Sequence, residues 1–474
     1  KNSDFGKSGH GKGKTANVEF VSANPTGPLT VGHGRNAVLG DAVSNILEWN
    51  GFSVTREYYF NDAGRQMRVL SESVEARYFE TLNKPSEFPE DGYQGSYIND
   101  IAKEMISEFG ENLSSGDALF KQVPEKKIFQ QIKNTLKKLG ISFDQFSNEK
   151  TFYDNGDINR LLDELESNDL IYKKDGATWF KSSALGKEQD RVFIKGSGEP
   201  TYRVPDTAYH RNKIERTFDL IIDVFGADHM DTYPDVLIAL QALGYKTDHI
   251  KVLLYQFVTL LRGGEKIKMS TRKANFITLD EFFNGNHEKL EQAYHPMVIR
   301  FFLLQAHYRS TIDFSNDALQ AAEKGLIRLF NAIQTLKELS SKEKSTVDIS
   351  LLQSKCDAAI NDDLNTPIVL SYLFDAVKII NSTKEGKHDL SNQDLESLKA
   401  IFKKYVFDIF GLNSINIHND QSNLDGLMKI ILDVRTQSKL NKDWATADKI
   451  RDGLQKLNIE IKDTKDGANW NYKK

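Results

Sequence analysis

Short apolar runs alternate with helix-like apolar spacings along the first part of the chain. Residues 18–21 form a mostly apolar run that predicts a short buried strand, and a turn-rich loop at 24–28 follows it. Across residues 38–47 the apolar positions recur at three- and four-residue spacings, which predicts an amphipathic helix ending at Gly51. Residues 53–60 predict a second strand. The three elements together predict a β-α-β unit with parallel strands.

Four later apolar runs extend the same pattern, at residues 177–180, 191–195, 220–225 and 250–261. Each predicts a strand, so we expect an α/β fold with a Rossmann-type parallel sheet. Residues 75–175 are charged and follow mostly helical patterns. We interpret this stretch as a mostly helical connecting insertion in the sheet domain, without chemistry of its own.

From about residue 282 onward the apolar spacings are helical, which predicts an all-α helical bundle. Helical patterns run roughly over 290–308, 315–341, 350–362, 366–383, 391–410, 422–439 and 443–457. Cys356 lies on the apolar side of one of them and is expected in the core.

Composition narrows the class of protein. A chain of 474 residues with 39% hydrophobic and 27% charged residues fits a soluble globular protein of about three domains. The net charge of −5 disfavours non-specific polyanion binding, and a single cysteine excludes an internal disulfide and a multi-thiolate zinc site. No apolar run approaches the ~20 residues of a membrane span. We expect a cytoplasmic protein without a membrane partner.

The loop between the first strand and the first helix carries the first candidate chemistry. Gly32 lets a ligand approach the backbone closely, and His33 lies where a helix N-terminus favours an anion. By itself a Gly-His pair is more often an ordinary strand-to-helix turn with a surface histidine. The neighbouring residues change that balance.

Residues 30–33, Thr-Val-Gly-His, resemble the His-Ile-Gly-His signature of class I aminoacyl-tRNA synthetases, with Thr30 in place of the first histidine. The preceding Glu19, Ser22 and residues 24–27, Asn-Pro-Thr-Gly, resemble an arginyl-tRNA synthetase in particular. Residues 92–98, Gly-Tyr-Gln-Gly-Ser-Tyr-Ile, resemble part of the connecting insertion of that family. This resemblance covers roughly residues 1–280.

Tyr202 and Asp206 are four residues apart, so on a helix they share a face. A carboxylate and a phenol on one face can hold a guanidinium, whereas the simpler alternative is an exposed helix start with a favourable aspartate. The pair resembles the arginine-binding helix of arginyl-tRNA synthetases. The resemblance implies that the following residues contact arginine: Glu19, Ser22, Asn24, Tyr202, Asp206 and His229.

A turn at Gly226, Asp228 and His229 follows another predicted strand, and the resemblance implies contacts with the adenosine or the amino acid. Residues 262–273 combine glycines with clustered cations, which suits a loop that closes on a triphosphate. They resemble the Lys-Met-Ser-Lys-Ser signature, although Thr271 replaces the second lysine. The implied ATP contacts are Gly32, His33, Gly226, Asp228, Lys268, Met269 and Ser270. The implied catalytic residues are His33, Lys268, Thr30 and Lys266.

The chain from about residue 276 to 474 resembles the C-terminal part of a cysteinyl-tRNA synthetase instead. The similar stretches are 297–310, 361–367, 442–451, 459–464 and 467–470. The resemblance implies that Trp444, Asp448 and Asp463 meet the tRNA anticodon, whereas helix capping and core packing are the alternative roles. An exposed aromatic ring that stacks on an unpaired base is a usual way to read RNA.

These observations predict an arginine-tRNA ligase that uses ATP with Mg²⁺, binds tRNA and arginine, and acts as a monomer. The expected organisation is a flexible lead-in (1–14), a catalytic domain (15–75 and 175–280), an insertion (75–175) and a helical tRNA-binding region (281–474). Two alternatives stay open: a cysteine-tRNA ligase, and a catalytically inactive tRNA-binding mosaic. The single cysteine disfavours the first, because the cysteine enzymes use a thiolate-rich zinc site.

Overall fold

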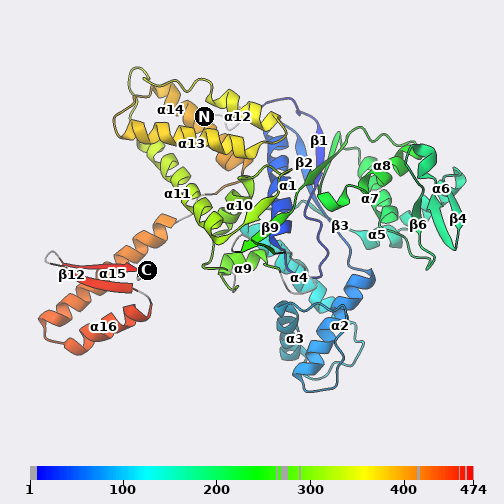
Figure 1. The fold of residues 1–474 in the computed structure, drawn as a ribbon, viewed down its shortest axis with the longest axis horizontal. Helices are drawn as coiled ribbons and strands as arrows, with labels where there is room; N and C mark the ends of the chain where they lie inside the picture. The colour runs from blue at the N-terminus through cyan, green and yellow to red at the C-terminus, as the bar shows by residue number, and fades with distance from the viewer. Residues whose placement is uncertain are drawn as a thin grey trace. The chain divides into compact units, whose positions relative to one another are not determined.

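A computed structural model describes residues 8–262, 265–267, 276–287, 290–413, 417–457, 459–464 and 467–472. The chain divides into two compact units, one ending at Asn413 and the other beginning at Ser414. The ribbon is shown in Figure 1. None of the described helices is long and apolar enough to cross a membrane.

The first unit is built on a five-stranded sheet with the order β3-β2-β1-β7-β8, and every neighbouring pair is parallel. Its strands are β1 (Thr15–Glu19), β2 (Ser53–Phe60), β3 (Gln145–Asn148), β7 (Leu220–Gly226) and β8 (Ile250–Tyr255). Since the strands are parallel, their carboxyl ends meet along one edge, where ligands of open α/β sheets bind. The predicted parallel sheet is confirmed.

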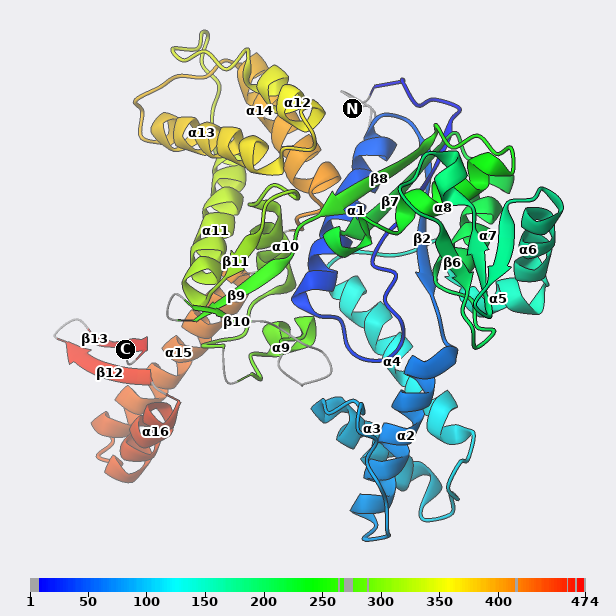
Figure 2. The same ribbon diagram turned by 45° about the vertical axis from the view of Figure 1, so that its right-hand side comes forward.

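Helices cover both faces of this sheet. Helix α1 (Val31–Trp49) crosses from β1 to β2 and packs against α10 (Pro296–Leu304), whereas α7 (Arg203–Glu215) packs against α8 (Tyr233–Ala242). Figure 2 shows α1 and α10 on one side of the sheet and α7 and α8 on the other. The burial of both faces fits the mostly apolar sequences of β7 and β8.

The segment between β2 and β7 forms two substructures. Helices α2 (Gly64–Thr81), α3 (Ser96–Phe109) and α4 (Leu119–Lys138) pack together at one end of the unit (Figure 1). The second substructure contains α5 (Glu149–Asp154), α6 (Asp157–Ser167), the 3₁₀ turn η1 (Ser182–Leu185) and a small antiparallel sheet. That sheet comprises β4 (Ile171–Lys174), β5 (Ala177–Phe180) and β6 (Arg191–Ile194).

Three strand assignments from the sequence need correction. β3 lies inside the range 75–175 that we assigned to a helical insertion, yet it pairs with β2 in the central sheet. The strands predicted at 177–180 and 191–195 form β5 and β6, which belong to the small sheet rather than the central one. The physical reason is that a strand's apolar pattern reports burial and does not identify its partner strand.

The predicted strand at 250–261 is two strands in two sheets. It breaks after β8, and β9 (Val258–Arg262) pairs with β10 (Glu265–Ile267) and β11 (Ile312–Phe314). At the break, the Arg35 guanidinium donates to the carbonyls of Gln256 (2.7 Å) and Phe257 (3.2 Å). Because the buried Arg35 side chain donates to both carbonyls, their hydrogen bonds are satisfied where the backbone leaves the first sheet.

Helices dominate the rest of the first unit, as predicted. They are α9 (Leu279–Asn284), α10, α11 (Asn316–Glu338), α12 (Leu352–Asn361), α13 (Thr366–Lys384), α14 (Asn392–Phe402) and the π-helical turn η3 (Lys403–Ile409). Cys356 is buried, as expected. The fully buried Arg300 pairs with Asp41 of α1 and donates to the carbonyls of Leu139 and Phe410. This bonding explains why the compact unit extends past the boundary we expected near residue 280.

The second unit contains α15 (Ile417–Leu440), α16 (Trp444–Lys456) and an antiparallel hairpin of β12 (Ile459–Thr464) and β13 (Gly467–Tyr472). Its small core includes Met428, Leu432, Leu454 and Ile459. The helical prediction holds for the two helices, but it missed the hairpin. The alternation Ile459-Glu-Ile461 is too short to stand out from the helical pattern before it.

Candidate functional site

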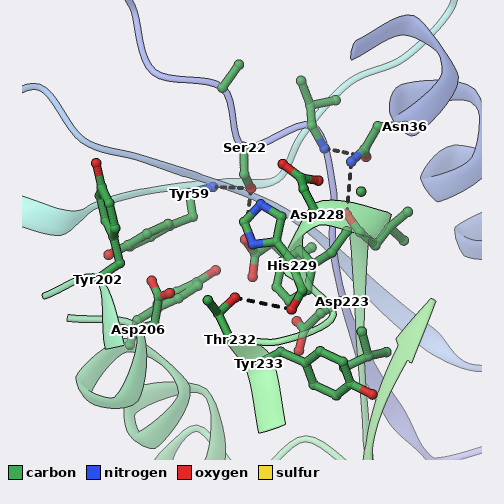
Figure 3. A pocket seen from close by; sticks show the side chains of 18 of the residues that line it. Ser22, Asn36, Tyr59, Tyr202, Asp206, Asp223, Asp228, His229, Thr232 and Tyr233 are labelled. Carbon is green, nitrogen blue, oxygen red and sulfur yellow. Dashed lines mark hydrogen bonds between the residues drawn. The ribbon is translucent and has the colours of Figure 1, made fainter. Parts of the chain in front are cut away.

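A cavity of about 590 Å³ opens over the carboxyl ends of β1, β2, β7 and β8 (Figure 3). The central sheet and α7 bring together nine of the predicted site residues along its lining. These are Glu19, Ser22, Asn24, His33, Tyr202, Asp206, Gly226, Asp228 and His229. The site that the sequence predicted in scattered pieces is thus one continuous pocket, with Thr30 and Gly32 next to it.

The loop after β1 is held in an unusual conformation. Val21 and Ser22 have positive φ angles of 67° and 44°, which residues other than glycine rarely adopt. Asn36 of α1 holds this loop, because its Oδ1 accepts from the backbone N–H of Val21 (2.7 Å) and its Nδ2 donates to the carbonyl of Val224 (2.9 Å). Strain of this kind persists only where the surroundings fix it, and it concentrates at functional sites.

His33 is oriented by the turn at the start of α1. The backbone N–H of Thr30 donates to Nδ1 of His33 at 3.1 Å, and the Thr30 hydroxyl lies 3.2 Å from the same nitrogen. Burial lowers the pKa of His33 to about 4, so the ring is neutral at pH 7. Because Nδ1 accepts, the proton lies on Nε2, which is available as a donor to a ligand. A Cβ on Gly32 would meet only the Thr30 hydroxyl at 3.6 Å, so this helix N-terminus stays open.

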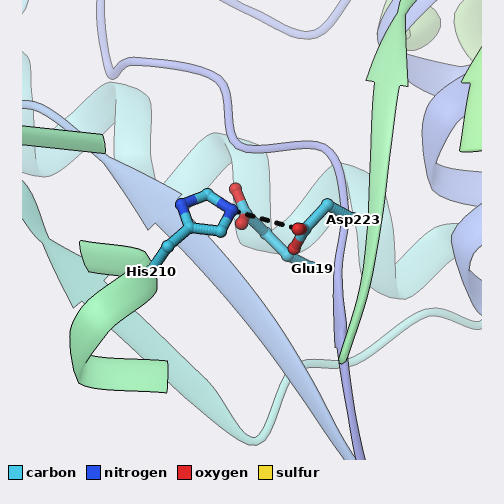
Figure 4. Close-up of side chains that lie close together, drawn as sticks. All are labelled: Glu19, His210 and Asp223. Atoms are coloured by element: carbon cyan, nitrogen blue, oxygen red, sulfur yellow. Dashed lines mark hydrogen bonds and ion pairs between the residues drawn. The ribbon is translucent and has the colours of Figure 1, made fainter. Parts of the chain in front are cut away.

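Below the pocket, Glu19 belongs to a buried charge cluster (Figure 4). The Lys213 ammonium pairs with Glu19 and lies 2.6 Å from Asp223, whose other oxygen lies 3.0 Å from Nε2 of His210. The second oxygen of Glu19 accepts from the Ser22 hydroxyl at 2.9 Å. The cluster therefore fixes the orientation of one carboxylate at the floor of the pocket.

Opposite charges in this cluster stabilise one another. Burial acts to lower the pKa of Lys213, but Asp223 and Glu19 outweigh it and hold that pKa above its usual value. Burial likewise acts to raise the pKa of Asp223, which Lys213 and His210 hold well below its usual value. Glu19, His210 and Asp223 offer ligand atoms within 4.8 Å of one another. Since the ammonium already contacts two of these residues, the cluster does not fit a resident metal ion.

Two carboxylates face the pocket from its other side. Burial raises the pKa of Asp206 to about 7, and burial also raises the pKa of Glu149. Glu149 accepts hydrogen bonds from the Tyr59 hydroxyl (3.0 Å) and from Nδ2 of Asn61 (2.7 Å). Neither carboxylate is ion-paired with a described residue. A bound cation would stabilise both in their ionised form.

Tyr202 and Asp206 share a face at the start of α7, as their spacing predicted. The Asp206 backbone N–H donates to the Tyr202 carbonyl at 3.1 Å, and the Tyr202 ring is 73% exposed. Figure 3 shows both side chains beside Tyr59 at the same end of the pocket. An exposed ring beside two carboxylates is free to stack on a planar cation.

The turn after β7 borders the pocket at its other end. A Cβ on Gly226 would lie 2.4 Å from Oδ1 of Asp228, so a larger residue there would displace the Asp228 side chain. His229 is exposed and stacks on Phe225, with 5.1 Å between the ring centroids. Both Asp228 and His229 line the pocket, and their contact with a ligand stays a prediction.

Glu149, Tyr59 and Asn61 were not predicted from the sequence. Glu149 directly follows β3, the edge strand that the apolar pattern did not reveal. Tyr59 and Asn61 lie at the end of β2, where residues of a parallel sheet face ligands. That position was a usable signal for the last two residues.

Some of the predicted ATP- and tRNA-binding residues lie outside the described residues, or are described only in their backbone. Lys268, Met269 and Ser270 lie outside the described residues, and for Lys266 the structure gives only its backbone place in β10. The same holds for Asp463 in β12. Trp444 begins α16 with its ring 60% exposed, and Asp448 pairs with Arg451 at 3.0 Å.

The fold and the pocket define the catalytic domain of a class I aminoacyl-tRNA synthetase. Residues 2–297 match the family described as tRNA synthetases class I (R), catalytic domain. The match covers more than half of the chain, so the chain belongs to this family of arginine-type synthetases. Residues 355–414 match the DALR domain family. The first match extends past the change in resemblance near residue 280, and the second lies entirely after it.

Known proteins agree with this assignment. The arginine-tRNA ligase of Desulfotalea psychrophila is 51% identical over 316 residues, which cover 66% of this chain and 56% of that protein. The arginine-tRNA ligase of Salinibacter ruber is 45% identical over 387 residues, covering 76% and 67%. The chain thus spans about half to two thirds of the length of these curated relatives.

A solved structure agrees as well. The crystal structure of a protein from Campylobacter jejuni, described as a candidate arginyl-tRNA synthetase, is 27% identical in sequence to this chain. It superimposes with a TM-score of 0.71 and covers 85% of this chain and 93% of that one. The arginyl-tRNA synthetase of Thermus thermophilus, at 19% identity and a TM-score of 0.63, shares the fold.

Proposed function

We propose that the chain activates arginine with ATP and transfers it to tRNA. The observation that carries this proposal is the pair of desolvated carboxylates, Asp206 and Glu149, beside the exposed ring of Tyr202. A guanidinium is planar, always charged and a donor on several edges, so it suits two carboxylates and a ring better than other amino-acid side chains do.

The opposite end of the pocket then holds the reacting groups. Glu19 and Asn24 are expected to bind the α-amino group, because both line the same pocket as Asp206 and His33. The carboxylate of arginine attacks the α-phosphorus of ATP, and the bond to pyrophosphate breaks to give arginyl-adenylate. A ribose hydroxyl of tRNA then attacks the carbonyl carbon, and AMP leaves. Catalysis comes from positioning and from charge stabilisation.

His33 and Gly32 fit the phosphates of ATP. The neutral ring presents its Nε2 proton, and the N-terminus of α1 adds its backbone N–H groups. Lys266, Lys268, Met269 and Ser270 are expected to supply further contacts to the phosphates, from the resemblance of their motif. Mg²⁺ is expected to arrive bound to the nucleotide, since the one described cluster of ligand residues already holds Lys213.

The second unit is expected to meet the tRNA through Trp444, Asp448 and Asp463. The exposed Trp444 ring supports this role, because base stacking needs a free aromatic face. We further expect a monomer in the cytoplasm, where a tRNA ligase finds its substrates.

Exchange of labelled pyrophosphate into ATP tests the proposal. It should be measured with arginine and separately with cysteine, each with and without unfractionated tRNA, because arginyl enzymes generally need tRNA for the exchange. We expect exchange with arginine only, and none with Asp206→Asn. Exchange with cysteine would show that the guanidinium assignment is wrong. Absence of exchange with both amino acids in the presence of tRNA would contradict the proposed ligase.

A further inference from the structure

Side chains join the loop after β1 to the end of β2. The Ser22 hydroxyl accepts from the backbone N–H of Tyr59 at 3.2 Å (Figure 3). Two residues further along each segment, Oδ1 of Asn24 accepts from the backbone N–H of Asn61 at 2.9 Å. The spacing of two residues is that of a β ladder, with side-chain oxygens in place of backbone carbonyls. The end of β2 therefore sets the position of the loop.

The other neighbour of Asn61 is the carboxylate of Glu149. Asn61 and Glu149 directly follow the paired ends of β2 and β3, where Phe60 lies opposite Asn148. Nδ2 of Asn61 donates to Oε1 of Glu149 at 2.7 Å. Asn61 thus holds Asn24 through its backbone and Glu149 through its side chain.

The amides in this chain of hydrogen bonds each have one orientation that satisfies their neighbours. Oδ1 of Asn61 accepts from the backbone N–H of Ala63 at 2.7 Å, so Nδ2 has to face Glu149. Nδ2 of Asn24 donates to Oε1 of Gln66 at 2.8 Å, which leaves its Oδ1 toward Asn61. The protein itself therefore orients both amides.

The two groups that Asn61 holds keep capacity for a ligand. A carbonyl oxygen has two lone pairs, so Oδ1 of Asn24 can accept from an ammonium in addition to Asn61. On Glu149, Asn61 and the Tyr59 hydroxyl each occupy one site on a different oxygen. An ionised carboxylate has about four such sites, so both oxygens of Glu149 can accept from one guanidinium.

We propose that Asn61 is a positioning residue that selects the length of the substrate side chain. In this role, which rests on the proposed function, Asn61 acts through the two groups it holds. Asn24 meets the α-amino end of the substrate and Glu149 meets the guanidinium. Because one residue fixes both, the span between them is constant, and a side chain one methylene longer than that of arginine has to buckle to bind both.

The simpler alternative is that Asn61 only supports the start of α2 through Ala63. Asn61→Ser separates the two roles. A serine hydroxyl can still accept from the Ala63 N–H, as in other short polar turns, but it is too short to reach Glu149. The backbone N–H that holds Asn24 also remains.

The probes are L-arginine and L-homoarginine, which has one more methylene, and titration calorimetry measures the Kd of each. One methylene changes selection in a shaped site by about 10- to 200-fold, so the parent should prefer arginine by about that factor. Asn61→Ser should reduce the preference to less than about threefold, because Glu149 can then move to meet either side chain. The ratio of the two Kd values does not depend on the fraction of folded protein.

Asn45→Ser is the matched control. Nδ2 of Asn45, on α1, also donates to a carboxylate, that of Asp41 at 3.2 Å, and Asn45 does not line the pocket. This variant should keep the preference of the parent. An unchanged preference in Asn61→Ser would overturn the proposal, and so would an equal loss of preference in Asn61→Ser and Asn45→Ser.

A double variant tests whether Asn61 acts through Glu149. Asn61→Ser combined with Glu149→Gln should have the same preference as Glu149→Gln alone, whereas a further loss would overturn the positioning role. Failure of the proposed function looks different, because the parent would then form no arginyl-tRNA. A wrong role for Asn61 leaves the parent active and selective for arginine.

Discussion

The ammonium of Lys213 lies 2.6 Å from the carboxylate of Asp223, and neither side chain is exposed. Lys213 also pairs with Glu19, so one cation contacts two buried carboxylates at the floor of the pocket. Removing one partner of such a pair leaves an uncompensated buried charge, which is more costly than never having buried the pair. The stability of the catalytic unit therefore depends on this cation.

Lys213→Met should lower the free energy of unfolding of the first unit by about 3–5 kcal/mol. Chemical denaturation followed by circular dichroism measures the change. Lys150→Met is the control, because Lys150 makes an exposed pair with Asp154 and its removal should have no measurable effect. Equal stability of the Lys213 variant and the parent would show that the buried carboxylates take up protons in the absence of the ammonium.

Arginine binding should depend on pH through Asp206. Burial raises the pKa of this carboxyl to about 7 in the free protein, whereas a bound guanidinium favours the ionised form. Below pH 7 the site must release a proton before it binds arginine, so the Kd should rise as the pH falls, by up to about tenfold per unit. The Kd should level off near pH 8, where Asp206 is already mostly ionised in the free protein.

Titration calorimetry in buffers of different ionisation enthalpy measures this proton release. Nearly one proton should leave per arginine bound at pH 6, and almost none at pH 8. Asp206→Asn should remove the proton release and weaken binding at every pH. A Kd that is independent of pH between 6 and 8 would show that another group holds the guanidinium.

Glu149→Gln should weaken arginine binding by about 10- to 100-fold, because it removes the charge from one of the two carboxylates while it keeps the size of the side chain. The Kd for ATP should not change. Glu164→Gln is a suitable control, since Glu164 pairs with Arg211 at 3.1 Å and does not line the pocket. Unaltered arginine affinity in Glu149→Gln would restrict guanidinium binding to Asp206 and Tyr202.

The comparison of Glu149 with Asp206 shows what the sequence could reveal. Tyr202 and Asp206 are four residues apart on one helix, so helical geometry alone predicts that they share a face. Glu149 lines the same pocket as Asp206 because the edge strand β3, which it follows, pairs with β2 in the central sheet. That pairing joins residues about 90 positions apart, and no local period encodes it.

The strand boundaries give the same lesson. β2 has the predicted bounds, Ser53–Phe60, because it lies between a helix end and a ligand-facing turn that both leave clear signals. The predicted strand at 250–261 is divided because Arg35, more than 200 residues earlier in the chain, binds the carbonyls at the break. Apolar periodicity contains no information about such a distant partner.

His33→Ala should lower kcat/KM for ATP by about 100- to 1,000-fold, the usual effect of removing one preorganised donor to developing charge. Thr30→Val should lower it by less than about tenfold. The reason is that the backbone N–H of Thr30, which survives the substitution, holds Nδ1 of His33 at 3.1 Å. Steady-state aminoacylation with varied ATP measures both effects. An equal loss in the two variants would mean that the Thr30 hydroxyl itself contacts the nucleotide.

Trp444 provides a test of the second unit. Its ring is 60% exposed at the start of α16, and the side chain of Asp443 caps that helix by accepting from the backbone N–H of Thr446 at 3.1 Å. Because the cap does not involve the ring, Trp444→Ala should leave the helix intact and remove only the stacking surface. Stacking of a base on an aromatic ring corresponds to a 5- to 150-fold change in affinity, so tRNA binding should weaken by about that factor.

Leu440→Ala is the matched control for this experiment, since Leu440 is 70% exposed at the end of α15 and has no aromatic face to offer a base. Filter binding with unfractionated tRNA should therefore separate the two variants, whereas their Kd values for arginine and ATP should be the same. If both variants bind tRNA as tightly as the parent, the Trp444 ring does not contact RNA. If both lose affinity equally, the exposed apolar surface acts without stacking on a base, and the anticodon role of Trp444 is wrong.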